Sequence, residues 1–229
     1  MERKTIYRNA IRMLLCGLIF FAVTMPFREL FSLMPVTEVR PASALPPAFG
    51  LLFGVWGALG TALGNLTADI ISGYSPWLCV TGFAAQFLYG YIPFKLWYAL
   101  GSLKEEQEFP KLDTARHVVK YLFIVAIDSL MVAGLLGFLM EGFGISQFLS
   151  STTFVLLLNN FDFCILLGMP VIILVSVTGI SVDVQKEKNH SQTGLLAAWA
   201  GILLLCAFAL TEALRPGLLS VWPCAAAAF

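Results

Sequence analysis

The sequence predicts an all-α integral membrane protein with about seven helices in one domain. Of its 229 residues, 59% are hydrophobic and only 12% are charged, about half the charged share of an ordinary soluble domain. Apolar runs recur at about the 20-residue length that a bilayer core requires. Fourteen basic and fourteen acidic residues cancel, so composition gives no indication of nucleic-acid binding.

The first apolar run begins at Ala10 and continues toward Leu33. We interpret it as a retained helix rather than a signal peptide, because no small-residue cleavage site follows it. Later runs cover residues 77–100, 118–140, 152–177 and 195–214. Turn residues and charges separate them, as expected for consecutive membrane helices.

Basic residues are concentrated in the first eight positions, between residues 104 and 120, and at residues 186–188. Short loops rich in Lys and Arg mark the cytoplasmic side of a membrane. We therefore expect the N-terminus inside and the segment 141–151, which has no basic residue, outside. The same alternation places the C-terminus outside.

This alternation requires an even number of crossings between the first helix and the run at 77–100. Two short helices, roughly 42–53 and 56–71, satisfy that parity. Gly60 and Gly64 form a GxxxG motif, and Ala58 and Ala62 form a second pair of small residues. Small residues let helix backbones approach closely, so we expect a tightly packed helical hairpin here.

Polar side chains within the apolar runs are functional hypotheses by default, because such groups are costly in lipid. Counted from the predicted outer side, several of them share one level on different helices. This level predicts a pocket that receives a polar solute from outside. The predicted ligand-binding residues, including two from the first outer loop (34–47), are Glu38, Arg40, Asn65, Asp69, Gln86, Tyr89, Asn159, Asn160 and Asp162.

A structural role is the alternative for each of these residues, because Asn, Gln and Asp also join membrane helices by hydrogen bonds. Asp128, beside Ser129 near the middle of its run, is open to both interpretations. The aromatic residues at the run ends are interpreted as an interfacial belt. These aromatic residues are Tyr74, Trp77, Trp97 and Tyr98.

The sequence carries no recognisable catalytic motif. It has no HExxH, no Gly-x-Ser-x-Gly and no phosphate-binding loop, and its two histidines and five cysteines have no metal-ligand spacing. We therefore predict no catalytic residue, no metal site and no cofactor, and interpret the cysteines as small apolar core residues. An intramembrane enzyme using Asp69, Asp128 and Asp162 is a minor alternative.

One stretch carries a family resemblance. It reads Thr37-Glu-Val-Arg-Pro-Ala-Ser-Ala-Leu-Pro-Pro-Ala-Phe-Gly-Leu-Leu-Phe-Gly and continues as Trp56-Gly-Ala-Leu-Gly-Thr-Ala-Leu-Gly-Asn-Leu-Thr-Ala-Asp. It resembles the substrate-binding S components of energy-coupling-factor (ECF) transporters. The resemblance covers about residues 10–180 and implies a six-helix core, to which residues 194–214 would add one extra helix.

By this resemblance, the chain would lie in a bacterial cytoplasmic membrane and bind a vitamin or similar micronutrient from outside. The loop 34–47 would cover the pocket. A transmembrane coupling subunit and a pair of ATPases would be its partners. The alternative is an integral membrane sensory module that binds a small ligand, favoured by the Pro-Pro and Leu-Gly-Asn-Leu segments of the second and third helices.

Overall fold

The computed structural model describes residues 2–32, 40–100, 110–145, 147–148 and 150–177. Apart from short connections, the described residues are helical. The elements are α1 (Glu2–Ser32), η1 (Pro41–Ala44), α2 (Leu45–Phe53), α3 (Val55–Ile71), α4 (Pro76–Ala99), α5 (Ala115–Gly142), α6 (Ser151–Phe163), η3 (Cys164–Gly168) and α7 (Met169–Val177). The extra helix predicted at 195–214 lies outside the described residues.

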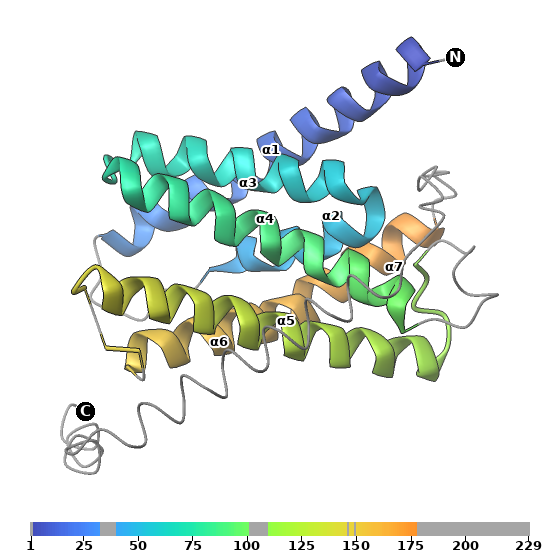
Figure 1. Cartoon of the computed structure of the whole chain (residues 1–229). Coiled ribbons are helices and arrows are strands. Elements are labelled where there is room, and N and C mark those ends of the chain that lie inside the picture. The colour runs from blue at the N-terminus through green and yellow to red at the C-terminus, as the bar shows by residue number, and fades with distance from the viewer. Residues whose placement is uncertain (1, 33–39, 101–109, 146, 149, 178–229) are drawn as a thin grey trace.

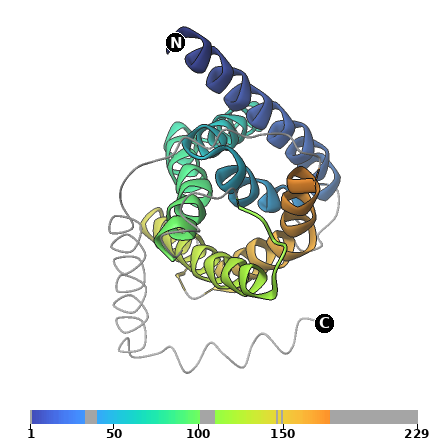
Figure 2. The ribbon, with the colours of Figure 1, turned by 90° about the vertical axis from the view of Figure 1, so that its right-hand side faces the viewer.

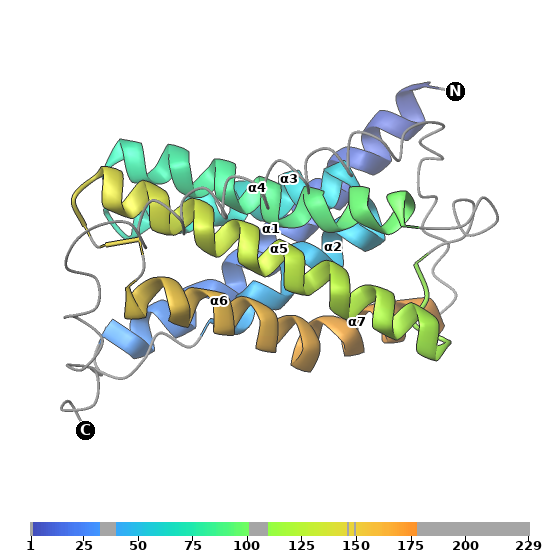
Figure 3. The same cartoon turned by 60° about the horizontal axis from the view of Figure 1, so that its bottom comes forward.

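The helices run lengthwise beside one another, with α1 crossing the bundle obliquely (Figure 1). Seen along the bundle, the longer helices form a ring and α2 lies inside it (Figure 2). A third view shows α5 beside the continuous α6–η3–α7 helix (Figure 3). The α3–α4 turn and the end of α5 share the end of the bundle at which α1 stops, whereas the α2–α3 turn and the start of α5 lie at the other end (Figure 1). This alternation agrees with the predicted chain path.

Among the described residues, three helical segments are long and apolar enough to cross a membrane: Thr5–Arg28, Ala115–Gly142 and Thr152–Val177. Large apolar side chains such as Leu18, Phe123 and Leu174 are exposed on them. Helix α4 has 24 residues, but it contains Gln86, Lys95 and an internal proline and is not among these three. The outer surface of the long helices is therefore apolar, as lipid contact requires.

The two short helices predicted at 42–53 and 56–71 are confirmed, within one residue at each end, as η1 with α2 and as α3. Gly54 separates them with a φ of 63°, and its N–H donates to the carbonyl of Gly50. A residue with a side chain would be strained in that conformation. The sequence therefore places glycine where the hairpin turns.

The second half of the predicted outer loop 34–47 is not a loop. From Pro41 the chain is helical, and Ala44, Ala48, Leu51 and Leu52 are completely buried. These residues are small or apolar, so the segment contributes to the centre of the bundle rather than to its surface. Residues 33–39, the first part of the loop, lie outside the described residues.

Glycines allow the ring to close around α2. Gly60 and Gly64 of α3 lie against the backbone of α1 at Met13 and Gly17. Gly50 of α2 lies against the backbone of α4 in the same way. The predicted GxxxG motif is thus a packing surface, but its partner is α1 rather than the other helix of the hairpin.

We expect Gly64→Ala to destabilise the fold, because the added Cβ would overlap the carbonyl of Gly17, which belongs to rigid backbone. Overpacking of this kind costs about 2 kcal/mol, measurable as a lower midpoint of thermal unfolding in detergent. Gly142→Ala is the matched control, since nothing lies within 4 Å of its added Cβ. Equal midpoints for the two variants would contradict the close α1–α3 contact.

Candidate functional site

Asp69, a predicted ligand residue, is held by an arginine at the end of α1. Arg28 donates from Nη2 to Asp69 Oδ1 at 2.6 Å and to Asn65 Oδ1 at 3.4 Å. Asn65 Nδ2 in turn donates to the second carboxylate oxygen of Asp69 at 2.7 Å. Arg28 Nη1 reaches Ser72 Oγ at 3.2 Å, and the guanidinium lies 5.4 Å from the ring centre of Tyr74. We call these five residues the Arg28 network.

The Arg28 network joins α1 to α3 and to the turn that follows α3. Gly82 of α4 leaves room for it, because a Cβ there would lie 2.9 Å from Asp69 Oδ2. Both carboxylate oxygens of Asp69 are occupied, and its side chain is 5% exposed. This geometry favours the structural interpretation of Asn65 and Asp69. Sequence reasoning missed Arg28, although a basic residue at the predicted outer end of the first helix was an available signal.

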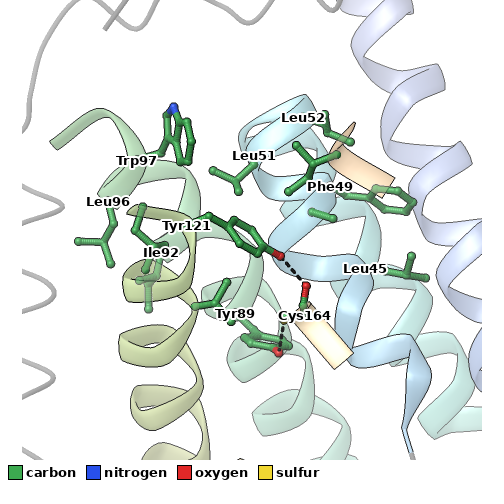
Figure 4. Packing of buried hydrophobic residues seen from close by; sticks show 14 of the residues in the cluster. Leu45, Phe49, Leu51, Leu52, Tyr89, Ile92, Leu96, Trp97, Tyr121 and Cys164 are labelled. Carbon is green, nitrogen blue, oxygen red and sulfur yellow. Dashed lines mark hydrogen bonds between the residues drawn. The ribbon is translucent and has the colours of Figure 1, made fainter. Parts of the chain in front are cut away.

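A second group of polar side chains lies at the centre of the bundle. Tyr89 of α4 donates from its hydroxyl to the carbonyl of Asn160 at 3.2 Å and lies 3.2 Å from Cys164 Sγ. Tyr121 of α5 donates to the carbonyl of Cys164 at 2.8 Å, and Figure 4 shows both tyrosines directed toward Cys164. The thiol of Cys164 lies 3.6 Å from the carbonyl of Ser43 in η1.

The carbonyls that receive these hydroxyls lie at the entrance to a π-helical segment. Residues Cys164–Gly168 form this wider turn within the long α6–α7 helix. Pro170 has no N–H to donate to the carbonyl of Leu166, so a regular α-helical ladder cannot continue there. Single π turns are often found at functional sites. Gly168 is required beside Tyr121, because a Cβ there would lie 2.6 Å from the tyrosine oxygen.

Asp128 lies on the same side of α5 as Tyr121. Tyr121, Val125, Asp128 and Val132 are all buried and follow the helical spacing that directs side chains to one face. Asp128 and its neighbour Ser129 are completely buried, and neither carboxylate oxygen nor the serine hydroxyl has a hydrogen-bond partner. Asp128 is close enough to act electrostatically on Tyr89, Tyr121 and Cys164. We call Asp128, Ser129, Tyr89, Tyr121 and Cys164 the central cluster.

The structure divides the predicted ligand residues. Tyr89 and Asn160 meet at the central cluster, whereas Asn65 and Asp69 belong to the Arg28 network. Gln86 and Asn159 are half-buried, and Asp162 and Arg40 are exposed; Glu38 lies outside the described residues. The single polar level predicted from the sequence is therefore two separate groups. The position of a residue along its helix does not tell toward which neighbouring helix its side chain points.

The aromatic residues predicted to form a belt differ in exposure. Trp77 and Tyr74 are exposed, but Trp97 is only 3% exposed and is not a belt residue. Its ring lies under Lys120 Nζ, 4.4 Å away, and beside His117. His117 also lies 2.7 Å from Asp113, just before α5, and this hydrogen bond lowers the pKa of the Asp113 carboxyl.

Comparison with known proteins gives no assignment: no family model, no curated protein and no solved structure matches the chain significantly. Within the part of the chain that the structure describes, no three His, Cys, Asp or Glu side chains are placed to share a metal ion. The assignment of the candidate site therefore depends on the geometry of the central cluster.

We expect Arg28→Ala to lower stability by about 2 kcal/mol, because it leaves the buried Asp69 carboxylate without its cation. Adding Asp69→Asn should restore most of that loss, since the charge that lacks a partner is then gone. Thermal unfolding of both variants in detergent measures the coupling. Lys111→Ala, at an exposed site, should change nothing, and a double variant less stable than Arg28→Ala would contradict this account.

Gly168→Ala should also destabilise the protein, by about 2 kcal/mol, because its Cβ would collide with the hydroxyl of Tyr121. Tyr121→Phe alone should cost about 1 kcal/mol through the lost hydrogen bond. In the Gly168→Ala background, however, Tyr121→Phe removes the colliding oxygen and should raise the unfolding midpoint. Simple additivity of the two effects would show that Gly168 does not face Tyr121.

Proposed function

We propose that this protein is the substrate-capture subunit of an ATP-driven micronutrient importer, similar to the S components of ECF transporters. The observation that carries the proposal is the central cluster. Polar groups are costly inside an apolar bundle, and those retained there without partners are candidates for function. A capture subunit needs such groups for its ligand, whereas a purely structural bundle does not.

The proposal places the chain across a bacterial cytoplasmic membrane several times, with its N-terminus inside. The three long apolar helices and the apolar exterior support insertion in lipid. The basic residues at the N-terminus and between residues 104 and 120 support this orientation. In this orientation the end of the bundle with the α3–α4 turn faces outside.

The helical turn η1 lies against the central cluster. Its Ser43 carbonyl lies 3.6 Å from the thiol sulfur of Cys164. Ala44, the next residue, has its carbonyl beside Gly168. A ligand bound at the central cluster would therefore lie near η1.

The chain would bind and release its ligand rather than transform it. Its sequence has no phosphate-binding loop, so a pair of ATPases acting through a transmembrane coupling subunit would supply the energy. By the same resemblance, release would follow toppling of the chain in the membrane. We assign it no enzymatic activity and no cofactor.

We expect the detergent-purified protein to retain one vitamin-like compound at about one molecule per chain, because a subunit that captures scarce solutes binds them tightly. Mass spectrometry of the extracted small molecules would identify it. Asn160→Ala should lose the compound, because it removes a buried amide side chain next to the main-chain carbonyl that accepts from Tyr89. Asn9→Ala, which changes a buried asparagine on α1, should retain it.

Co-purification of the coupling subunit and ATPases from native membranes would test the partners separately. A compound bound without these partners would favour the alternative of a sensory module. An empty extract, together with no change in unfolding temperature across a panel of vitamins, would contradict substrate capture.

A further inference from the structure

Asp128 is the acidic residue of the central cluster, and the fold gives its carboxylate no hydrogen-bond partner. It lies near the midpoint of the 28-residue helix α5, about 20 Å from either end at 1.5 Å per residue. Its side chain is completely buried and its two oxygens have no donor. Removing a carboxylate from water costs several kcal/mol unless a partner compensates. No hydrogen bond in the fold offsets this cost for Asp128.

The neighbouring groups offer mainly acceptors. The hydroxyl groups of Tyr89 and Tyr121 already donate to the carbonyls of Asn160 and Cys164, respectively. Each tyrosine oxygen still has lone pairs with which to accept. The thiol hydrogen of Cys164 is directed to the carbonyl of Ser43. Ser129, with no partner, is the one remaining hydroxyl that could either donate or accept.

The cations of the neighbouring helices are engaged elsewhere. Arg28 is bound to Asp69 in the Arg28 network. On α4, Lys95 lies over the rings of Tyr91 and Phe94, and on α5 Lys120 lies over Trp97. Within the described part of the chain, no basic side chain donates a hydrogen bond to the Asp128 carboxylate.

We propose that Asp128 binds a cationic nitrogen of the captured ligand, with the oxygens of Tyr89 and Tyr121 accepting its further N–H groups. This inference rests on the proposed capture function and specifies the ligand class. The ligand carries a protonated amine, an amidine or an amino-substituted cationic ring. A hydrogen bond between two charged groups is stronger than one between neutral groups, and a buried site strengthens it further.

A metal ion fits the same position less well. Hard cations such as Ca²⁺ and Mg²⁺ take six or more oxygen ligands, and the central cluster provides one carboxylate. A single carboxylate with two aromatic hydroxyl oxygens matches the few directed N–H donors of an organic cation. An anionic ligand is excluded by charge, because it would face Asp128 without a compensating cation.

Direct binding to the purified protein tests the inference. Calorimetric titration at pH 7 would use thiamine, pyridoxamine and putrescine as cationic probes, and biotin and pantothenate as anionic probes. At least one cationic probe should bind, and Asp128→Asn should weaken that binding at least tenfold. Asp113→Asn, which changes an exposed carboxylate just before the same helix, should leave binding unchanged.

Thermal unfolding without ligand separates binding from structure. Asp128→Asn keeps the shape and removes a buried charge, so its unfolding midpoint should equal or exceed that of the wild type. Weaker binding with undiminished stability is a combination that a merely structural residue would not give. If Asp128→Asn folds poorly, Asp128→Glu is the second variant to test. It keeps the charge and should retain part of the affinity.

Three results would overturn the inference. They are tight binding of an anionic probe, unchanged binding in Asp128→Asn, and no binding of any cationic probe to the wild type. If a compound still co-purifies in any of these cases, the capture function stands and only the ligand class is wrong. If nothing co-purifies and no probe binds, both proposals fail together.

Discussion

Close contact between helix backbones is the constraint on which the rest of the structure depends. A bundle with an entire helix inside its ring can close only if the surrounding helices approach very tightly. Gly17 of α1 meets Gly60 and Gly64 of α3, and Gly50 of α2 meets Gly90 of α4. Lipid gives helices no hydrophobic reason to associate, so such small-residue contacts provide packing energy that larger side chains would prevent.

Placing α2 and η1 inside the ring has a consequence for polar groups. Carbonyls of η1, of the end of α6 and of the π turn η3 come to the centre of an apolar bundle, where each needs a donor. Tyr89, Tyr121 and the thiol of Cys164 provide those donors from three different elements. The central cluster is thus partly a structural requirement, and its tyrosines would be needed even without a ligand.

The sequence predicted the helices well and the site only in part. The short helices were predictable because glycine and proline mark their ends and the charge alternation requires their number. The membrane orientation and the family resemblance stay predictions. Pairing across the bundle was not predictable: Arg28, at the predicted outer end of the first helix, was assigned no partner, and Asp162 was placed in the pocket although its side chain is exposed. Trp97 was misassigned for the same reason, because position in the sequence gives depth along a helix but does not identify the neighbouring side chain.

Asp69 and Asp128 show how neighbouring side chains determine the role of a buried carboxylate. Both are aspartates in apolar helices, and both are buried. One is bound by a cation from its own chain, so its charge contributes to the fold and has little left for a ligand. The other lacks such a partner, so the free energy that burial costs remains available to any cation that enters. A neutral residue in place of Asp128 would remove this cost, and in the proposed function a cationic ligand offsets it instead.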